Sequence, residues 1–196
     1  MTSADPDGPA GDKQAARLAL LARRRARPES DRQAARDALT AALLTFIGDA
    51  AVVCVYLPLG SEPLAPDLPA LLTKRGIGVL LPRARAGQAL DWCAYGFGSR
   101  RGSLGIEEPL GPGLGTAAVR SADVVLVPAL AVDPRGNRLG RGGGHYDRTL
   151  ALVGTGSRTV AVVFDDEVVE AVPVGPHDVP VRFVATPSSG VQALPR

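Results

Sequence analysis

The sequence predicts an α/β domain built on a mostly parallel sheet. Short, uninterrupted apolar runs are typical of strands that are covered on both faces, and helical segments separate these runs. The runs lie at residues 51–56, 77–81, 123–127 and 159–164. The 23 glycines and 17 prolines punctuate the chain between them, as expected for a packed protein rather than a low-complexity one. At 196 residues the chain is expected to form one domain.

Two antiparallel helices are expected before the first strand. Residues 12–27 are rich in helix formers, and Pro28 ends this segment. The expected buried face of this first helix carries Leu18, Leu21 and Ala22. The second helix is expected to start at a capping box formed by Ser30 and Gln33 and to end near Gly48.

The rest of the chain supplies further elements and two tails. The expected elements are a helix at residues 67–75, an edge strand at 89–95, a long glycine-rich loop at 96–115, a short helix at 146–153 and a last strand at 181–185. The folded domain is expected over residues 12–190, between a disordered N-terminal tail at 1–11 and a C-terminal tail at 191–196. Ligands bind beyond the carboxyl ends of parallel strands. The site is therefore expected in the loops that follow Tyr56, Val127 and Phe164.

Composition and charge exclude several classes of protein. The formal net charge is only +2, which gives no sign of a nucleic-acid partner. The 2 cysteines cannot form a disulfide framework, and no Cys or His cluster predicts a zinc site. No apolar stretch approaches the roughly 20 residues of a membrane span, and no signal peptide is visible. A cytoplasmic protein with neither a membrane nor a nucleic-acid partner is therefore expected.

The segment NRLGRGGGHYD at residues 137–147 carries the strongest functional signal. Its four glycines are Gly140, Gly142, Gly143 and Gly144. They let backbone N–H groups approach one centre, and the following helix adds its positive end. Arg138 and Arg141 add fork-shaped cations that suit phosphate, and Asp147 adds a hard oxygen ligand for Mg²⁺. Walker A and dinucleotide fingerprints are absent, and a flexible surface loop would share this composition. The pattern favours a polyphosphate site.

Other candidate residues give weaker signals. Lys13 and Arg17 share one helix face and could reach a phosphate, although a solvated basic stripe would look the same. Glu62, six residues past a buried strand, could contact the N–H groups of a ligand or could be a solvated loop residue. His177 and Asp178 lie in a proline-flanked loop, where no second histidine supports a His-based metal site.

These motifs together resemble the 5-formyltetrahydrofolate cyclo-ligase family, also called methenyltetrahydrofolate synthetase, from Lys13 to about Pro187. The matching segments are K-x-x-x-R from Lys13, Y-x-P-x-x-x-E from Tyr56, L-P-R from Leu81, G-I-x-E-P from Gly105, VPALAVDPRGNRLGRGGGHYDRTL from Val127, H-D at His177 and T-P at Thr186. The long segment is the most specific of these. The resemblance implies a three-layer α/β/α sandwich with an N-terminal helical pair.

The resemblance also implies an activity. Enzymes of this family use ATP and Mg²⁺ to cyclise 5-formyltetrahydrofolate to 5,10-methenyltetrahydrofolate through a phosphorylated formyl group, an iminium phosphate, and they release ADP and phosphate. The substrate is a small molecule, with or without a polyglutamate tail, and a monomeric enzyme is expected.

The resemblance assigns roles residue by residue. The implied ATP-binding positions are Lys13, Arg17, Arg138, Leu139, Gly140, Arg141, Gly142, Gly143, Gly144, His145 and Tyr146. The implied substrate-binding positions are Arg17, Leu57, Glu62, Arg141, Gly142, Gly143, Gly144 and His145. Arg141 and Tyr146 are the implied catalytic positions, and Asp147 and Asp178 are the implied Mg²⁺ ligands. His145 replaces the usual Tyr or Phe, and the acidic segment 165–167 has no assigned role.

Two alternative functions rank below the cyclo-ligase. A non-catalytic nucleotide- or RNA-binding protein would use the arginine-rich run at residues 23–27, but this run has no interleaved aromatic residues. A sugar-phosphate isomerase would need a base in the cleft but neither ATP nor Mg²⁺. An assay with 5-formyltetrahydrofolate, ATP and Mg²⁺ separates all three.

Overall fold

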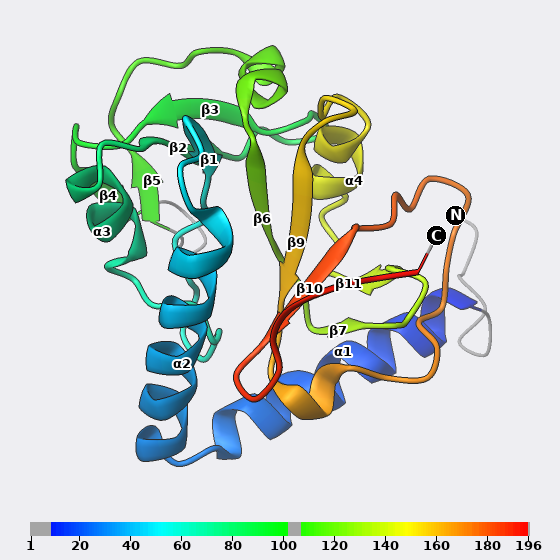
Figure 1. The fold of residues 1–196 in the computed structure, drawn as a ribbon. Helices are drawn as coiled ribbons and strands as arrows, with labels where there is room; N and C mark the ends of the chain where they lie inside the picture. The colour runs from blue at the N-terminus through cyan, green and yellow to red at the C-terminus, as the bar shows by residue number, and fades with distance from the viewer. Residues whose placement is uncertain (1–8, 102–106, 196) are drawn as a thin grey trace.

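The central sheet has seven strands in the order β11-β10-β9-β6-β1-β2-β3 (Figure 1). A computed structural model describes residues 9–101 and 107–195. The strands of the sheet are β1 (Val52–Cys54), β2 (Gly78–Arg83), β3 (Asp91–Ala94), β6 (Val124–Pro128), β9 (Arg158–Val162), β10 (Phe183–Thr186) and β11 (Gly190–Ala193). The five central strands are parallel, and β3 and β11 add antiparallel edges. The predicted α/β class and the edge strand near residue 91 are confirmed.

Helices cover both faces of the sheet, because successive side chains of each buried strand point to opposite faces. Val53 of β1 packs in the cluster covered by α2 (Glu29–Ile47) and α3 (Leu68–Lys74), whereas Cys54 packs in the cluster on the opposite face. Trp92, which is fully buried, lies in that second cluster together with residues of η1 (Thr116–Ser121) and α4 (His145–Leu150). The fold is therefore the predicted three-layer sandwich.

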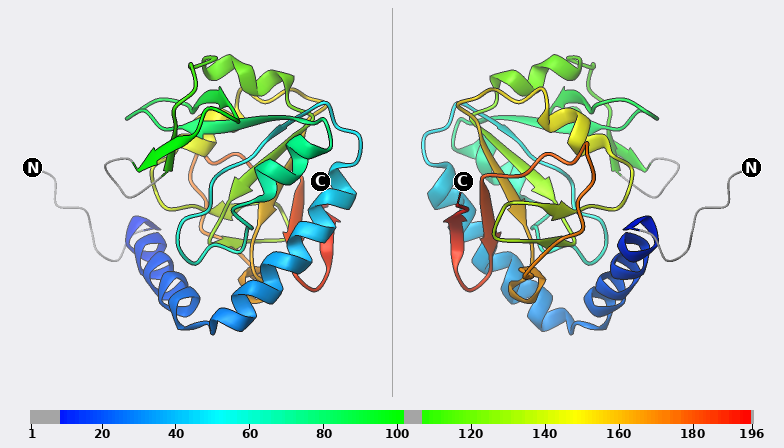
Figure 2. Two further views of the ribbon diagram at one scale, coloured as in Figure 1. Left: turned by 90° about the vertical axis from the view of Figure 1, so that its left-hand side faces the viewer. Right: turned by 90° about the vertical axis from the view of Figure 1, so that its right-hand side faces the viewer.

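The two N-terminal helices do not form an antiparallel pair, which corrects the prediction. Figure 2 shows α1 (Pro9–Ala26) and α2 diverging from their junction at Pro28. The apolar side of α2, including Leu39 and Leu43, packs on the sheet. In contrast, Leu20 of α1 packs in a separate cluster with Leu130 and Leu139. Each helix follows the apolar surface that it covers, and these surfaces face different directions.

The predicted buried face of α1 is right only at Leu21, which is half-buried against the cluster that contains Leu20. Leu18 is 60% exposed and Ala22 is exposed, while Leu20 and Arg24 are buried. The buried face of α1 therefore includes Leu20 and the charged Arg24, whose guanidinium group pairs with Glu167. The helix begins at Pro9 rather than at residue 12.

The capping box predicted for α2 is absent. The helix begins at Glu29, after Pro28, without a side-chain cap. Ser30 donates a hydrogen bond to Asp31, and Gln33 donates one to Asp37, so neither side chain caps the helix. Both pairs form between neighbours on the helix itself, where they compete with capping.

Three segments expected to be irregular contain strands. The glycine-rich stretch at 96–115 contains the antiparallel pair β4 (Ser99–Arg101) and β5 (Glu107–Pro109), and the start of the G-I-x-E-P motif lies outside the described residues. The predicted tail at 191–196 instead provides β11 up to Ala193. The loop after β6 contains a hairpin made of β7 (Ala131–Val132) and β8 (Arg138–Leu139). Within 9–101 and 107–195, no helix is long and apolar enough to cross a membrane.

Candidate functional site

The site forms where loops from three parts of the sheet meet at the carboxyl ends of the strands. A carboxylate in the loop after β1, Glu62, contacts Arg141 of the loop after β8. Asp178, in the loop that precedes β10, contacts Lys13 of α1. These are the loops where the sequence places the site. The structure thus brings together candidate residues that are 79 and 165 positions apart in the sequence.

The sequence DPRGN shapes the turn that leads into the site. Oδ1 of the buried Asp133 accepts hydrogen bonds from the backbone N–H groups of Arg135 and Asn137, and the Asn137 side chain binds Oδ2. Gly136 adopts φ +81°, and a Cβ there would overlap the carbonyl oxygen of Val181. Only glycine satisfies both constraints. This turn sets the direction of β8, which carries the first arginine of the site.

Arg138 and Asp147 form a partly buried ion pair within the glycine-rich segment. The Arg138 Nη2 atom lies 2.6 Å from Oδ1 of Asp147, and its Nη1 donates to the carbonyl of Val179. The Arg138 side chain is only 5% exposed. The backbone N–H of Val179 also donates to Asp147. A predicted phosphate-binding cation and a predicted metal ligand are thus paired with each other.

Arg17 packs directly on the glycine-rich segment. Its Nε donates a 2.9 Å hydrogen bond to the carbonyl of Gly140. A Cβ at Gly142 would lie 3.4 Å from the Arg17 guanidinium carbon, and Gly142 has φ +101°. Gly144 has φ +63° and precedes α4. The positive φ angles therefore favour glycine at Gly142 and Gly144, while the Arg17 guanidinium carbon lies at ordinary contact distance from a Cβ at Gly142.

Lys13 and Asp178 form a second ion pair. Their Nζ and Oδ2 atoms are 2.7 Å apart, and the backbone N–H of Gly175 also donates to this oxygen. Burial alone would raise the pKa of Asp178, but the hydrogen bonds from Lys13 and Gly175 lower it overall. Asp178 is therefore an anion at neutral pH. This places a charged carboxylate next to a cation predicted to bind phosphate.

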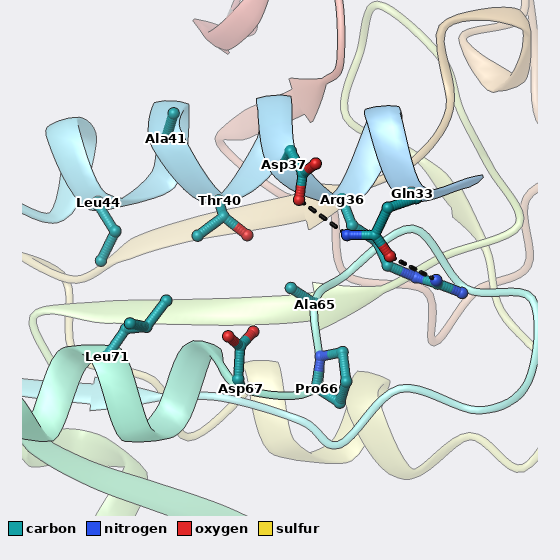
Figure 3. A pocket seen from close by; sticks show the side chains of 10 residues that line it. All are labelled: Gln33, Arg36, Asp37, Thr40, Ala41, Leu44, Ala65, Pro66, Asp67 and Leu71. Carbon is teal, nitrogen blue, oxygen red and sulfur yellow. Dashed lines mark hydrogen bonds between the residues drawn. The ribbon is translucent and has the colours of Figure 1, made fainter. Parts of the chain in front are cut away.

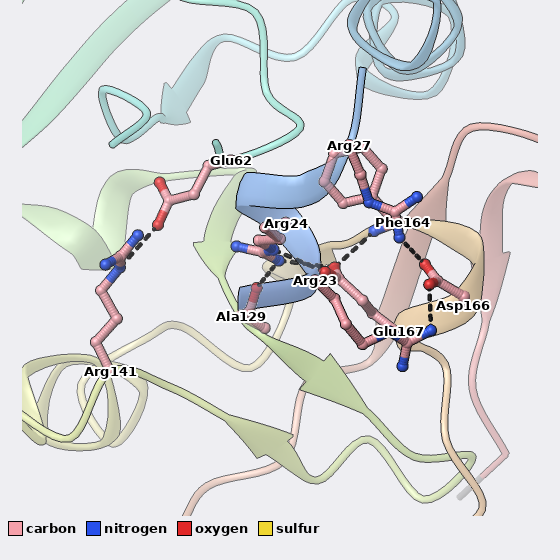
Figure 4. A network of polar contacts seen from close by, with 9 residues as sticks. All are labelled: Arg23, Arg24, Arg27, Glu62, Ala129, Arg141, Phe164, Asp166 and Glu167. Carbon is pink, nitrogen blue, oxygen red and sulfur yellow. Dashed lines mark hydrogen bonds and ion pairs between the residues drawn. The ribbon is translucent and has the colours of Figure 1, made fainter. Parts of the chain in front are cut away.

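Glu62 and Arg141 form the third ion pair, which Figure 4 shows. Nε of Arg141 lies 3.1 Å from Oε1 of Glu62, and the Leu59 N–H donates to Oε2. The Glu62 side chain is 5% exposed, whereas that of Arg141 is 41% exposed. The carboxylate is therefore fixed by the protein, and the arginine is the partner that can move.

Two tyrosine hydroxyl groups lie near Glu62. Within the described residues, the hydroxyl groups of Tyr56 and Tyr146 are buried and have no hydrogen-bond partner. Burial raises the pKa of both tyrosines well above the usual value, and the negative charge of Glu62 adds to this shift. Both hydroxyl groups therefore keep their protons at neutral pH and can act only as neutral donors or acceptors.

The remaining predicted residues differ in what they can offer a ligand. The Leu139 side chain is buried in the cluster under α1, which leaves its backbone as the accessible part. Leu57 is half-buried against the core. Nδ1 of His145 lies 3.0 Å from the carbonyl oxygen of Gln88, so this ring ties the glycine-rich segment to the β2–β3 loop. Gly143 is exposed, and its carbonyl accepts a hydrogen bond from Arg148.

Asp147 and Asp178 fit the role of Mg²⁺ ligands in part. They are brought to one place because Val179, the neighbour of Asp178, binds Asp147. In the described part of the chain no three Asp, Glu, His or Cys side chains gather as a closed metal site. Mg²⁺ usually takes one or two carboxylates, keeps several waters and binds substrate phosphates. Two hard oxygen donors beside the segment that the sequence predicts to bind a polyphosphate suit that pattern.

Sequence reasoning missed the residues that anchor α1. Nε and Nη2 of Arg24 lie 2.7 Å from the two Glu167 oxygens, and Nη2 also donates to the Ala129 carbonyl (Figure 4). Asp166 pairs with both Arg23 and Arg27. The acidic segment 165–167 is η2, so these residues hold α1 against the end of β9. The signal in the sequence was a match between a basic helix and an acidic turn, and this pairing engages three of the arginines that the RNA-binding alternative would use.

A cavity of about 570 Å³ lies elsewhere, between α2 and α3 (Figure 3). Gln33, Asp37 and Thr40 of α2 line one side of it, and Pro66 and Asp67 line the other. None of the predicted site residues contributes to its lining. The cavity is therefore separate from the site that the loops form.

The comparison with known proteins decides the family. A model of the 5-formyltetrahydrofolate cyclo-ligase family matches residues 9–187. The chain belongs to this family. The resemblance drawn from the sequence motifs is confirmed, and the protein is an enzyme.

Individual cyclo-ligases and their structures agree with this assignment. The 5-formyltetrahydrofolate cyclo-ligase of Mycolicibacterium smegmatis is 43% identical over 184 residues, which cover 91% of this chain and 95% of the relative. The 5,10-methenyltetrahydrofolate synthetase of Aquifex aeolicus has a TM-score of 0.72 at 26% identity, over 94% of this chain and 93% of the other. The synthetase of Mycoplasma pneumoniae shares the fold, with a TM-score of 0.71 at 17% identity over 88% and 97%.

Proposed function

We propose that the protein cyclises 5-formyltetrahydrofolate to 5,10-methenyltetrahydrofolate, with consumption of ATP, a requirement for Mg²⁺ and release of ADP and phosphate. The names of its relatives support this reaction. One observation carries the proposal: four cations converge on one glycine-rich segment beside three carboxylates. The cations are Lys13, Arg17, Arg138 and Arg141, and the carboxylates are Glu62, Asp147 and Asp178.

The reaction needs activation of a formamide, because its carbon is a poor electrophile and its oxygen a poor leaving group. Transfer of the γ-phosphoryl group to the formyl oxygen gives an iminium phosphate. N10 then forms a bond to the formyl carbon and loses its proton. The carbon–oxygen bond breaks, phosphate leaves and the cyclic methenyl cation remains. The protein has to align the formyl oxygen with the phosphoryl group and to stabilise the charge that moves between them.

The three ion pairs of the site are proposed to open when the ligands bind. Arg141 turns from Glu62 to the transferred phosphoryl group, and Lys13 and Arg17 contact other phosphate oxygens. Glu62 then accepts hydrogen bonds from the N–H groups of the pterin ring. Tyr146, which stays protonated because its pKa is raised, donates a hydrogen bond to the reacting oxygens. Each of these contacts places a charge or a donor where the reaction moves electrons.

Asp147 and Asp178 would hold the Mg²⁺ ion that the reaction requires. When bound, Mg²⁺ neutralises phosphate oxygens and orients the phosphate chain. Asp147, the more exposed partner, would turn from the buried Arg138 to the metal and leave the Arg138 guanidinium group to a phosphate, and Asp178 is released when Lys13 turns toward phosphate. The carboxylates and the cations therefore exchange partners within the site.

The direct test incubates purified protein with 5-formyltetrahydrofolate, ATP and Mg²⁺ and follows the near-ultraviolet absorbance of the methenyl product. We expect product that depends on all three components. Folded protein that gives no product above the control without enzyme would contradict the proposal. ADP formed in the same reaction is expected to match the product mole for mole.

Asp147→Asn is expected to raise the Mg²⁺ concentration needed for half-maximal activity on the order of tenfold, because a neutral amide is a weaker ligand. The measurement is a Mg²⁺ titration at fixed ATP. Asp37→Asn serves as the control, because Asp37 is an exposed residue of α2 outside the site. An unchanged Mg²⁺ titration for Asp147→Asn would remove this residue from the proposed metal site.

A further inference from the structure

Three buried hydrogen-bond donors within range of the charge of Glu62 have no partner in the described residues. They are Nη1 of Arg24, the hydroxyl group of Tyr56 and the hydroxyl group of Tyr146. Tyr146 already has a proposed role. Nothing in the fold or in the proposed reaction accounts for the other two, which come from α1 and from the end of β1.

Hydrogen bonds from Nε and Nη2 hold the Arg24 guanidinium group in place. It is 0% exposed, and its Nε and Nη2 atoms bind Glu167 and the Ala129 carbonyl. Burial alone would lower the pKa of Arg24, but Glu167 and, at longer range, Glu62 raise it overall. Figure 4 shows the guanidinium group between Glu167 on one side and the Glu62–Arg141 pair on the other. Nη1 of Arg24 therefore belongs to a charged, rigid group that faces Glu62, the carboxylate proposed to hold the substrate.

Tyr56 reaches the same place from the sheet. It follows β1 and is 4% exposed. Burial raises the pKa of its hydroxyl group most, and electrostatic interactions with Glu62, Arg24, Tyr146 and Glu167 act on it as well, so the hydroxyl lies within range of this charged cluster. A phenylalanine would fill the same apolar space, so the hydroxyl group is the part that needs an explanation.

A buried donor without an acceptor is costly, and more so when it carries a charge. Such donors in a binding site are satisfied when a ligand supplies an acceptor. The cluster offers an acceptor, Glu62, next to two donors. The complementary ligand edge has N–H groups beside a carbonyl oxygen. A 2-amino-4-oxo pterin ring has this edge, since its amino group and N3–H lie beside the 4-oxo group.

We propose that Nη1 of Arg24 and the hydroxyl group of Tyr56 bind the 4-oxo group of the pterin ring while Glu62 accepts its N–H groups. This inference rests on the proposed function, because it assumes that Glu62 holds the folate. The two donors make the site selective for a ring carbonyl. A 4-amino group in that position presents N–H to donors, which leaves both sides unpaired.

The test measures equilibrium binding by calorimetry with two ligands, 5-formyltetrahydrofolate and its 2,4-diamino counterpart. Wild-type protein and Tyr56→Phe are compared in the absence of ATP. Wild-type protein is expected to bind the 4-oxo compound at least tenfold more tightly. Tyr56→Phe is expected to weaken binding of the 4-oxo compound about tenfold and to leave the 2,4-diamino compound nearly unchanged.

Thr40→Val is the matched control. The Thr40 hydroxyl group is also buried without a partner among the described residues, but it belongs to α2 beside the separate cavity. Both substitutions remove a hydroxyl that makes no hydrogen bond to any residue the structure describes, so both variants are expected to unfold at or above the wild-type temperature. Only Tyr56→Phe is expected to alter ligand binding.

The outcomes separate this inference from the proposed function. A wild-type protein that binds neither ligand would overturn the proposed function and the inference together. Wild-type binding combined with unchanged binding in Tyr56→Phe would overturn the inference alone. An equal loss for both ligands in Tyr56→Phe would also overturn it, because the hydroxyl group would then shape the site without contacting the carbonyl oxygen.

Discussion

Arg141→Ala is expected to lower kcat by about a hundredfold to a thousandfold, which corresponds to a loss of about 3–4 kcal/mol of transition-state stabilisation. The Arg141 side chain is 41% exposed and is bound through Nε to Glu62, so it is able to turn toward a bound phosphate. Charge builds up on the phosphoryl group during transfer, and a fixed guanidinium group stabilises that charge more than it stabilises the ground state. The dissociation constant for ATP is therefore expected to change much less than kcat.

The measurement combines steady-state kinetics with direct ATP binding. Arg100→Ala is the matched control, because Arg100 is an exposed arginine that also faces a glutamate, 3.6 Å away on β5. It is expected to leave both quantities unchanged. Turnover that stays at the wild-type level in Arg141→Ala would show that the reacting phosphate lies elsewhere. A loss of ATP affinity as large as the loss of kcat would show that Arg141 binds the ground state only.

The central strands could be predicted from the sequence because they are buried on both faces. The apolar runs around Val53, Val125 and Val160 are too short for a buried helix and long enough for a buried strand. All three are strands in the structure. The short strands β4, β5, β7 and β8 could not be predicted. Each has two or three residues, and backbone pairing across a turn, rather than an apolar pattern, defines it.

The members of the candidate site could be identified from the sequence, but their pairing could not. Glycines, arginines and carboxylates in one segment indicate phosphate chemistry by their type alone. The contact between Arg138 and Asp147 depends on the turn at Asp133, and that between Lys13 and Asp178 depends on where α1 lies. Such pairs follow from tertiary structure, which spacing along the chain does not encode.

The position of α1 shows why charge patterns mislead when they are assessed locally. Five arginines between residues 17 and 27 suggest a solvated basic surface. In the structure Arg24 is fully buried, and Arg23 and Arg27 bind Asp166. A basic helix and an acidic turn that are far apart in sequence have to be considered together before either is assigned to the surface.

Arg24→Met is expected to lower the free energy of unfolding by about 3–5 kcal/mol, because it leaves the carboxylate of Glu167 buried without its cation. The Glu167 side chain is 1% exposed and also accepts a hydrogen bond from the Phe164 backbone, so it cannot turn out to water. Equilibrium urea unfolding measures the loss. Glu167→Gln added to Arg24→Met is expected to recover part of it, since an uncharged amide still accepts that hydrogen bond.

Arg23→Met is the control for Arg24→Met, because it also removes one arginine from an ion pair of α1, but from an exposed pair rather than a buried one. Arg23 pairs with Asp166 at 2.5 Å, but the two side chains are 57% and 40% exposed, so its loss is expected to cost less than about 1 kcal/mol. A similar small cost for Arg24→Met would mean that Glu167 finds another partner and that α1 is held by its apolar contacts. A large cost that Glu167→Gln partly reverses would show that the buried pair fixes α1. The helix that carries Lys13 and Arg17 would then depend for its position on the buried pair of Arg24 and Glu167.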